Sequence, residues 1–571
     1  MKRILILMAL LSGTLPGAAE SQNWDGLVDR FFDAYFHFNP SAATSAGFHA
    51  YDTQLEDLSA TSIQRYLATL HRFETEFSAF PATRLSSGQA ADRDLVLGTI
   101  RAGLLEFETI RNQERNPDNY TSAATNAIFV VMSRNFAPAT QRLHSVIERE
   151  RQIPALLAAA RANLKNPPRI FTEVALEQLP GIISFFQKDI PLAFGSVQDQ
   201  ALLDQFRRSN ADTVRELGAY ENFLRNLTPK SNGDFRIGAE NFRRKLLYEE
   251  MVDIPLERLL QIGYADLRNN QRMLRETAER IDPKKTPRQI LDEANHDHPA
   301  PDKLLDAFRN TFGGLRDFIA QHNIATIPPS VAPTVEETPP FMRALTFASM
   351  DTPGPYETVG KEAFFNVTLP EKDWPQKSIE EHMSQFNRGT IVSTAIHEAY
   401  PGHYVQFLEM QNASSKVRKL LGANSNAEGW AHYCEQMMID EGYGAGDQKH
   451  ADLRLRIGQL QDALMRNARY IVGIEMHTGK MTYQQGIDFF VNEGMLTRTN
   501  GERETRRGTS DPTYLYYTLG KLQILKLRED YRKLRGPAFN LREFHDTFLK
   551  QGFPPIKIVR RAMLGNDSPV L

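Results

Sequence analysis

Two histidines and a glutamate stand close together in the run HEAYPGH, residues 397–403. Hydrolysis of an amide with zinc requires three protein ligands, an open position for water and a general base beside that water. His397 and Glu398 supply a ligand and an adjacent carboxylate, as at the start of the motif H-E-x-x-H. His403 comes two residues later than the second histidine of that motif. The run therefore predicts a zinc site whose backbone departs from a regular helix.

The residues between the two histidines can produce that departure. In a regular helix a residue four positions on lies about 40° around the axis, whereas one six positions on lies about 240° around it. Pro401 lacks a backbone donor and Gly402 permits unusual dihedral angles, so the helix can bulge or end there and turn His403 back toward His397. Glu398 would then take a proton from the water and pass it to the leaving amine.

The third ligand is expected on a nearby helix, and the segment NAEGWAHYCEQM offers candidates. Glu428, His432 and Glu435 are spaced i, i+4 and i+7, which places them within about 60° of one another on one helical face. By geometry alone His432 competes with Glu428 for the metal. A His–Glu pair that is solvated, or that forms a hydrogen bond in a core, is the alternative without a metal.

These segments resemble a widespread bacterial family of unknown function whose members carry HEAxPGHxxQ and EGWAxYxE. Here the two motifs read HEAYPGHYVQ and EGWAHYCE, and the resemblance covers essentially the whole mature chain. The family is similar to the gluzincin metallopeptidases, which include thermolysin and the largely helical carboxypeptidase Taq. The resemblance implies Zn2+ held by His397, His403 and Glu428, with Glu398 as the base.

Other positions take an expected role from the same resemblance. Glu435 matches the last acidic residue of the second motif and would support a ligand. The family position that matches His432 is variable, which disfavours His432 as a ligand. The segment ARYIVGIEMHTGKM contains the recurring Arg469 and His477, but Gly473 and Ile474 fill the region where the family has an acid. An arginine–acid pairing within this segment is therefore not carried over.

The segment DPTYLYYTLGKLQILKLR resembles a Tyr-x-x-Gly helix of the family, with Tyr517 and Gly520. A zinc peptidase needs a hydrogen-bond donor for the oxyanion of the tetrahedral intermediate. Tyr517 is the first candidate for this donor and His477 is the second. The alternative is that Tyr514, Tyr516 and Tyr517 pack a core with their hydroxyls outward.

An arginine could bind a carboxylate of a peptide, because its planar fork of N–H groups matches a carboxylate. Arg528 follows Tyr517 by eleven residues, about 20° out of register on a helix, so both could point into one cleft. This arrangement would suit a carboxypeptidase or a dipeptidyl carboxypeptidase. Arg506 and Arg507 compete for the role, and a surface ion pair is the alternative for Arg528.

Most of the chain has apolar residues at helical spacing between Pro, Gly, Asn and Asp, which predicts a mainly α protein. The predicted helices include residues 24–35, 62–77, 139–164, 202–227, 256–281 and 453–477. Residues 327–370 differ, because β-favouring runs at 344–349 and 363–369 flank the turn sequence DTPGP. We expect a small antiparallel sheet there, where an extended substrate could pair with a strand edge. A surface hairpin without a role is the alternative.

These patterns divide the chain into a signal peptide at 1–19, an N-terminal helical lobe at 20–327 and a catalytic lobe at 328–571, with the sheet at 328–370. Two lobes around a central cleft are the simplest arrangement, and the resemblance implies a metallopeptidase-like fold.

The first twenty residues, MKRILILMALLSGTLPGAAE, show the cations, short apolar stretch and small residues of a secretory signal. The apolar stretch is too short to span a bilayer, and the region has no cysteine to acylate. We expect a secreted, periplasmic protein without stable membrane insertion.

The composition narrows the function further. The chain has 571 residues, 41% of them hydrophobic, and a formal charge of -3, so it offers no polybasic surface for nucleic acid. We therefore expect a zinc-dependent peptidase that acts on short peptides; no oligomeric state is predicted. The alternatives are an amidase that acts on peptidoglycan stem peptides and a non-catalytic peptide- or metal-binding protein. Glu398 argues against the second alternative, because a non-catalytic zinc site needs no base.

Overall fold

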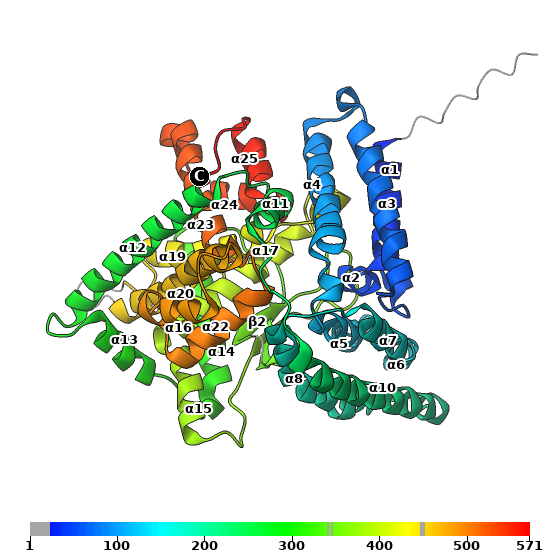
Figure 1. Ribbon diagram of the computed structural model, residues 1–571. Helices are drawn as coiled ribbons and strands as arrows, with labels where there is room; N and C mark the ends of the chain where they lie inside the picture. Colours follow the sequence, from blue (N-terminus) through cyan, green and yellow to red (C-terminus); the bar gives the residue numbers. More distant parts are fainter. Residues whose placement is uncertain (1–22, 340–341, 344–345, 446–451) are drawn as a thin grey trace, which may run out of the picture.

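The computed structural model describes residues 23–339, 342–343, 346–445 and 452–571 (Figure 1). The predicted signal peptide lies outside these residues. The described chain is mainly helical with one small sheet, as the sequence predicts. Within the described ranges, no helix combines the length and the apolar character needed to cross a membrane.

The first helices form a layer of their own, drawn in blue in Figure 1. They are α1 (Trp24–Phe38), α2 (Pro40–Ala46), α3 (Ala60–Ala79) and α4 (Ser87–Leu104). The side chains of Asn23 and Ser59 cap α1 and α3, and Ser86 and Gln89 form a capping box on α4. The predicted helices at 24–35 and 62–77 are confirmed.

The next helices surround a second core. They are α5 (Asp118–Met132), α6 (Ala139–Glu150), α7 (Ile153–Asn163), α8 (Arg169–Ser184), α9 (Ile190–Ala193) and α10 (Gln200–Leu227). The predicted helix at 202–227 is confirmed, but the single helix predicted at 139–164 is wrong. Two helices occupy this segment, and Pro154 lies in the first turn of the second one, where its missing N–H is tolerated.

The remaining helices carry and enclose the candidate site. Before the site motifs lie α11 (Ala239–Glu250), α12 (Leu256–Ile281), α13 (Pro287–His296), α14 (Leu304–Gln321) and α15 (Gln376–Met383). The motif helices are α16 (Arg388–Glu398), α17 (His403–Met410), α18 (Lys416–Leu420) and α19 (Asn424–Asp440). The last are α20 (Leu453–His477), α21 (Tyr483–Asn492), α22 (Arg498–Ser510), α23 (Tyr516–Arg535), α24 (Leu541–Leu549) and α25 (Ile556–Leu564). The predictions for α12 and α20 match to the residue.

The sheet has three strands in the order β1-β3-β2, namely β1 (Thr334–Glu337), β3 (Phe364–Val367) and β2 (Ala348–Asp351). β2 pairs with β3 antiparallel, whereas β1 pairs with β3 parallel, so the prediction of an antiparallel sheet is wrong for one of the two pairs. The turn between β2 and β3 allows a direct antiparallel return, while β1 reaches the far side of β3 through a longer connection. Residues 344–345 of the predicted run lie outside the described residues. β2 packs beside α16.

Besides the cluster that joins α14 to the sheet and to the helices of the site motifs, two hydrophobic clusters contain side chains from both sides of residue 327. One joins α1, α3 and α4 to Val417, Leu421 and Ile558. The other joins α11, α12 and α13 to α20 and α23. The two predicted parts of the chain therefore share cores, and a central cleft between two lobes stays a prediction.

Candidate metal centre

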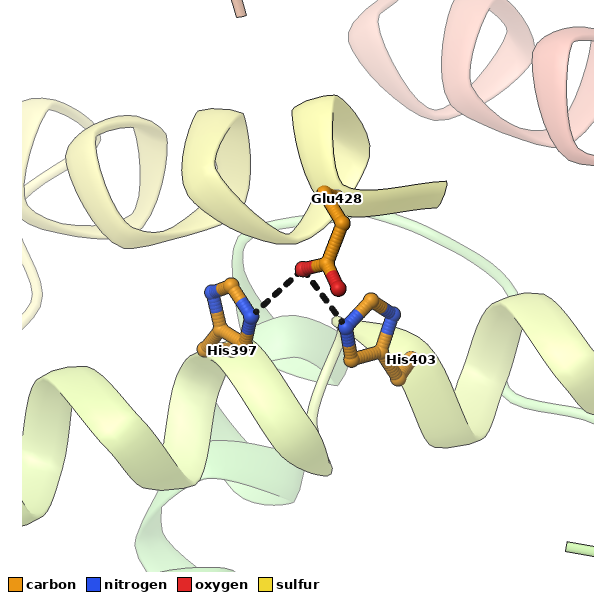
Figure 2. Close-up of side chains that lie close together, drawn as sticks. All are labelled: His397, His403 and Glu428. Atoms are coloured by element: carbon orange, nitrogen blue, oxygen red, sulfur yellow. Dashed lines mark hydrogen bonds and ion pairs between the residues drawn. The ribbon is translucent and has the colours of Figure 1, made fainter. Parts of the chain in front are cut away.

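The two histidines of HEAYPGH lie on different helices that meet at this run (Figure 2). α16 ends at Glu398 and α17 begins at His403. Between them the N–H of Gly402 donates to the carbonyl of Ile396 over 3.0 Å. A β-carbon at Gly402 would lie 1.8 Å from the carbonyl oxygen of His397, so only glycine fits. The predicted interruption of the helix is thus an end and a new start, and it turns both imidazoles to one side.

Glu428, in the second turn of α19, faces both imidazoles (Figure 2). Its Oε2 lies 3.2 Å from Nε2 of His397 and 3.3 Å from Nε2 of His403. The ligand atoms of the three residues all lie within 4.8 Å of one another. The structure thus brings together the three predicted ligands, and of the two candidates for the third ligand it is Glu428 that lies in this cluster.

This spacing fits a zinc ion. Nitrogen and oxygen ligands in tetrahedral positions about 2.0–2.1 Å from zinc lie about 3.4 Å from each other. The two nitrogen–oxygen distances above are close to that value. Nδ1 of His403 is buried and has no hydrogen-bond partner among the described residues. The coordinating edge, built from Nε2 atoms and one carboxylate oxygen, is a donor set that zinc accepts.

The hydrogen bonds of His397 also indicate that a positive charge lies between this imidazole and the carboxylate of Glu428. Nδ1 of His397 lies 2.6 Å from Oε1 of Glu435, a carboxylate that can only accept, so Nδ1 carries the proton. In the neutral ring Nε2 then has a lone pair aimed at the carboxylate of Glu428. Two electron-rich atoms at 3.2 Å require either a second ring proton or a metal ion between them. Hydrogen bonds to Glu428 and Glu435 outweigh burial and raise the pKa of His397 to about 9.

Behind His397 lies a buried group of charged side chains. Glu435 is fully buried and lies 3.0 Å from Nη2 of Arg466. Its second oxygen lies 3.2 Å from Nδ1 of His432. Burial lowers the pKa of His432 to about 4, so this ring is neutral. His432 therefore supports Glu435 and does not join the ligand cluster.

Glu398 is half-buried beside the ligands. Burial raises the pKa of its carboxyl, and Glu428 adds to this effect, while His397 and His403 oppose it. Its carboxylate has no hydrogen bond or ion pair to any residue of the described ranges. A carboxyl with a raised pKa and no structural partner is suited to exchange protons with a ligand.

Tyr517 and Arg507 also lie at the site. The ring of Tyr517 stacks against that of His397 with 6.3 Å between centroids. Nη2 of Arg507 donates to the hydroxyl of Tyr517 over 3.3 Å and to that of Tyr516 over 3.4 Å. Tyr516 in turn donates to Asp511 over 3.0 Å. Burial raises the pKa of Tyr517, so its hydroxyl keeps its proton and can donate it in a hydrogen bond.

Close packing of α19 on α23 fixes Glu428 relative to Tyr517. A β-carbon at Gly429 would lie 2.5 Å from the α-carbon of Gly520, so both positions require glycine. The indole of Trp430 then donates to the carbonyl of Pro401 over 2.9 Å. The glycine and tryptophan of the EGW motif therefore position the bend that carries His403.

The structure does not bring His477 and Arg528 to the ligands. Nε2 of His477 lies 2.7 Å from the carbonyl oxygen of Gly508, and its ring packs among phenylalanines. Arg528 donates to Tyr433 over 3.1 Å and to Glu441 over 2.7 Å. Angular register alone suggested that Arg528 could reach the site, but eleven residues advance about 16 Å along a helix.

Sequence reasoning missed two groups at the site. Arg466 contacts Glu435, and no motif pointed to it, although it precedes Arg469 by one helical turn. The acid that pairs with Arg469 is Glu504 on α22, which accepts two hydrogen bonds of 2.6 and 2.9 Å. The family pattern places this acid within the segment that forms α20, but α20 supplies only the arginine of the pair.

Comparison with known proteins gives a family and a fold. A profile of the family described as bacterial protein of unknown function (DUF885) matches residues 40–563. No curated protein sequence matches the chain. A proposed lipoprotein of unknown function from Shewanella oneidensis has 26% identity and a TM-score of 0.78, over 95% of this chain and all of that one. A proposed lipoprotein from Colwellia psychrerythraea has 17% identity and a TM-score of 0.80, over 95% and 98% of the two chains.

Proposed function

Because the chain belongs to the bacterial DUF885 family of unknown function, its activity has to be inferred from its site, and we propose that it is a zinc-dependent peptidase acting on short peptides. One observation carries the proposal. His397, His403 and Glu428 present three ligand atoms within 4.8 Å of one another, and the carboxylate of Glu398 stands beside them without a structural partner among the described residues. A purely structural metal site would not need that carboxylate.

A bound zinc ion would polarise the scissile carbonyl and lower the pKa of a water at its open position. Glu398 would take the proton of that water and deliver it to the leaving amine. The hydroxyl of Tyr517 would donate a hydrogen bond to the carbonyl oxygen that becomes negative during hydrolysis. Arg507 favours this orientation, because it already donates to the oxygen of the same hydroxyl. Glu435 would hold the ring of His397 in the tautomer that presents Nε2.

The same proposal includes an envelope location. The two similar structures are described as proposed lipoproteins. The first residues of this chain carry the predicted secretory signal, and the single cysteine is Cys434. The periplasm is the compartment that fits both observations.

Metal analysis combined with a peptide library tests the function. We expect the purified protein to bind one zinc and to cleave short peptides, and a chelator to abolish cleavage until zinc is restored. His403→Ala should lose the zinc and the activity. The control is His144→Ala, at a solvent-exposed histidine far in sequence from the site motifs, and it should keep both the zinc and the activity.

The outcome also separates the alternatives. The protein could cleave cross-linked or stem peptides from peptidoglycan and no ordinary peptides. That result would assign it as an amidase of the cell wall instead of a peptidase. Zinc binding without hydrolysis of either substrate would identify a binding protein and contradict the role of Glu398.

A further inference from the structure

The second feature of the site is a group of arginines around Tyr517. The guanidinium carbons of Arg469, Arg466 and Arg507 lie 4.9, 5.5 and 5.8 Å from the centre of the Tyr517 ring. Arg503 lies one turn before Arg507 on α22. A site with this much positive charge is built to receive negative charge, beyond the oxyanion that a peptide bond develops during hydrolysis.

The carboxylates of the protein do not use all of these donors. Glu504 is attracted to Arg469, Arg507 and Arg503 together, and although burial opposes it, these three cations lower the pKa of Glu504 to about 2. Glu504 forms its two hydrogen bonds with Arg469, so the hydrogen-bonding capacity of Arg469 is largely taken. One buried carboxylate thus serves several guanidinium groups.

Arg507 has donors to spare. Its hydrogen bonds, to Asp511, Tyr516 and Tyr517, all use the single nitrogen Nη2. Its Nε and Nη1 have no protein partner among the described residues, and 33% of the side chain is exposed. Arg528 differs, because both of its terminal nitrogens already bind protein oxygens.

We propose that Arg507 binds the carboxylate at the C-terminus of the peptide substrate, so that the protein removes residues from C-terminal ends. This inference rests on the proposed peptidase function. Tyr517 contacts both Arg507 and His397, and two extended residues span at most about 7 Å. A carboxylate on Arg507 therefore belongs to the first or second residue after the scissile bond, and the product is an amino acid or a dipeptide.

Arg507 also links this recognition to Tyr517. Its N–H donates to the hydroxyl oxygen of Tyr517, so the hydroxyl proton points elsewhere. A peptide that anchors on Arg507 meets a Tyr517 already oriented to donate. Asp511, which also accepts from Nη2, keeps the guanidinium in place while the other nitrogens remain open.

The test compares one neutral peptide as a free acid and as a C-terminal amide, with zinc-loaded protein and products identified by mass. We expect cleavage at the last or penultimate bond of the free acid, and cleavage of the amide slower by at least about 100-fold, because a neutral amide cannot accept the paired hydrogen bonds of the guanidinium as a carboxylate does. Arg507→Gln should slow the free acid by a much larger factor than the amide, because both substrates lose the orientation of Tyr517 but only the free acid loses its anchor, and Arg507→Lys should restore part of the loss for the free acid. Arg506→Gln, a neighbour whose ion pair with Glu177 is exposed, should change neither rate.

Several results would overturn the inference. Equal cleavage of acid and amide, or cleavage at internal bonds, would show that the terminal carboxylate is not recognised, although the peptidase function would stand. An amide that regains full activity when it carries an internal Asp or Glu would assign Arg507 to an acidic side chain instead. If the zinc-loaded protein cleaved no peptide at all, the proposed function would fail and this inference with it.

Discussion

The two sides of His397 differ in almost every physical respect. On one side lie Glu428, with 24% of its side chain exposed, and the half-buried Glu398. On the other side lie Glu435, with no exposed side-chain surface, and Arg466, with 9%. We call the first set the open side and the second the buried side. Both sides place a carboxylate on the same imidazole, but only the open side leaves room for a ligand.

This difference separates residues that can take part in the reaction from residues that hold the others in place. A carboxylate on the open side can exchange protons or ligands, because solvent and substrate reach it. A carboxylate on the buried side is fixed by an arginine and fixes the histidine in turn, as expected of groups behind a metal ligand. Changes on the open side should alter activity and spare the fold, whereas changes on the buried side should alter both.

The largest effect on activity is expected from Glu398→Gln on the open side. Loss of the general base should reduce the turnover rate by about 10²- to 10⁴-fold. The zinc content and the free energy of unfolding should stay at wild-type values, because Glu398 has no hydrogen bond or ion pair within the described ranges. Turnover assays, metal analysis and urea unfolding measure the three quantities. A variant with normal turnover would remove Glu398 from the mechanism.

A smaller loss of activity, with a loss of stability, is expected from Glu435→Gln on the buried side. Zinc affinity should fall about 10- to 100-fold, because the partner that holds His397 becomes neutral. The free energy of unfolding should fall by about 3–5 kcal/mol, because Arg466 is left buried without its counter-charge. Zinc competition with a chelator dye and urea unfolding of the chelated protein measure these effects.

Glu441→Gln provides the matched control at the end of the same helix. Glu441 is 31% exposed and pairs with Arg528, so the change should cost less than about 1 kcal/mol and leave zinc affinity unchanged. If both variants behaved alike, the distinction between the open and the buried side would be wrong.

The residues of the open side are easier to predict from the sequence than those of the buried side. Residue types and motif spacing were enough to predict His397, His403 and Glu398, because they come from one short segment. Spacing left the third ligand open between Glu428 and His432, and the family resemblance favoured Glu428. Glu435 was predicted only as a supporting residue. Arg466 was not predicted, because a charge partner contributed by another helix leaves no trace in the spacing of either helix. The choice of Arg507 over Arg528 likewise needed the position of α22 relative to α23.

The same limit applies to the fold. Apolar spacing fixed the bounds of α12 and α20, since long helices repeat the pattern many times. The parallel pairing of β1 was not predictable, because four residues give a weak signal and pairing direction depends on the path of the chain. The break between α6 and α7 could have been anticipated from Pro154.

A third prediction concerns Trp430, which supports the bend before His403 from the buried side. Trp430→Phe keeps a ring stacked on Phe548 but removes the donor to the carbonyl of Pro401. An unpaired buried carbonyl should lower the free energy of unfolding by about 1–3 kcal/mol, and zinc affinity should fall by less than about tenfold. Urea unfolding and zinc competition test this expectation. Trp374→Phe, at a tryptophan that is 36% exposed, should change neither quantity.

The smallest effect is a pH dependence that arises on the far face of α19. His545 is fully buried, donates from Nδ1 to the carbonyl of Ile324 and accepts from Tyr433, which in turn accepts from Arg528. Burial lowers the pKa of His545 to about 3. Below pH ~6.5 the unfolded chain therefore binds a proton at this residue that the folded protein does not bind, so its contribution to stability is lost as the pH falls.

We expect the free energy of unfolding to fall by about 2 kcal/mol more in the wild type than in His545→Gln between pH 7 and pH 4.5. Urea unfolding of both proteins with a chelator present isolates this difference, because His397 and the other titrating groups contribute equally to both curves and cancel. Parallel curves would mean that His545 can be protonated in the folded protein. The contact between α24 and Tyr433 of α19 would then be open to solvent, and the buried side would be less rigid than its packing indicates.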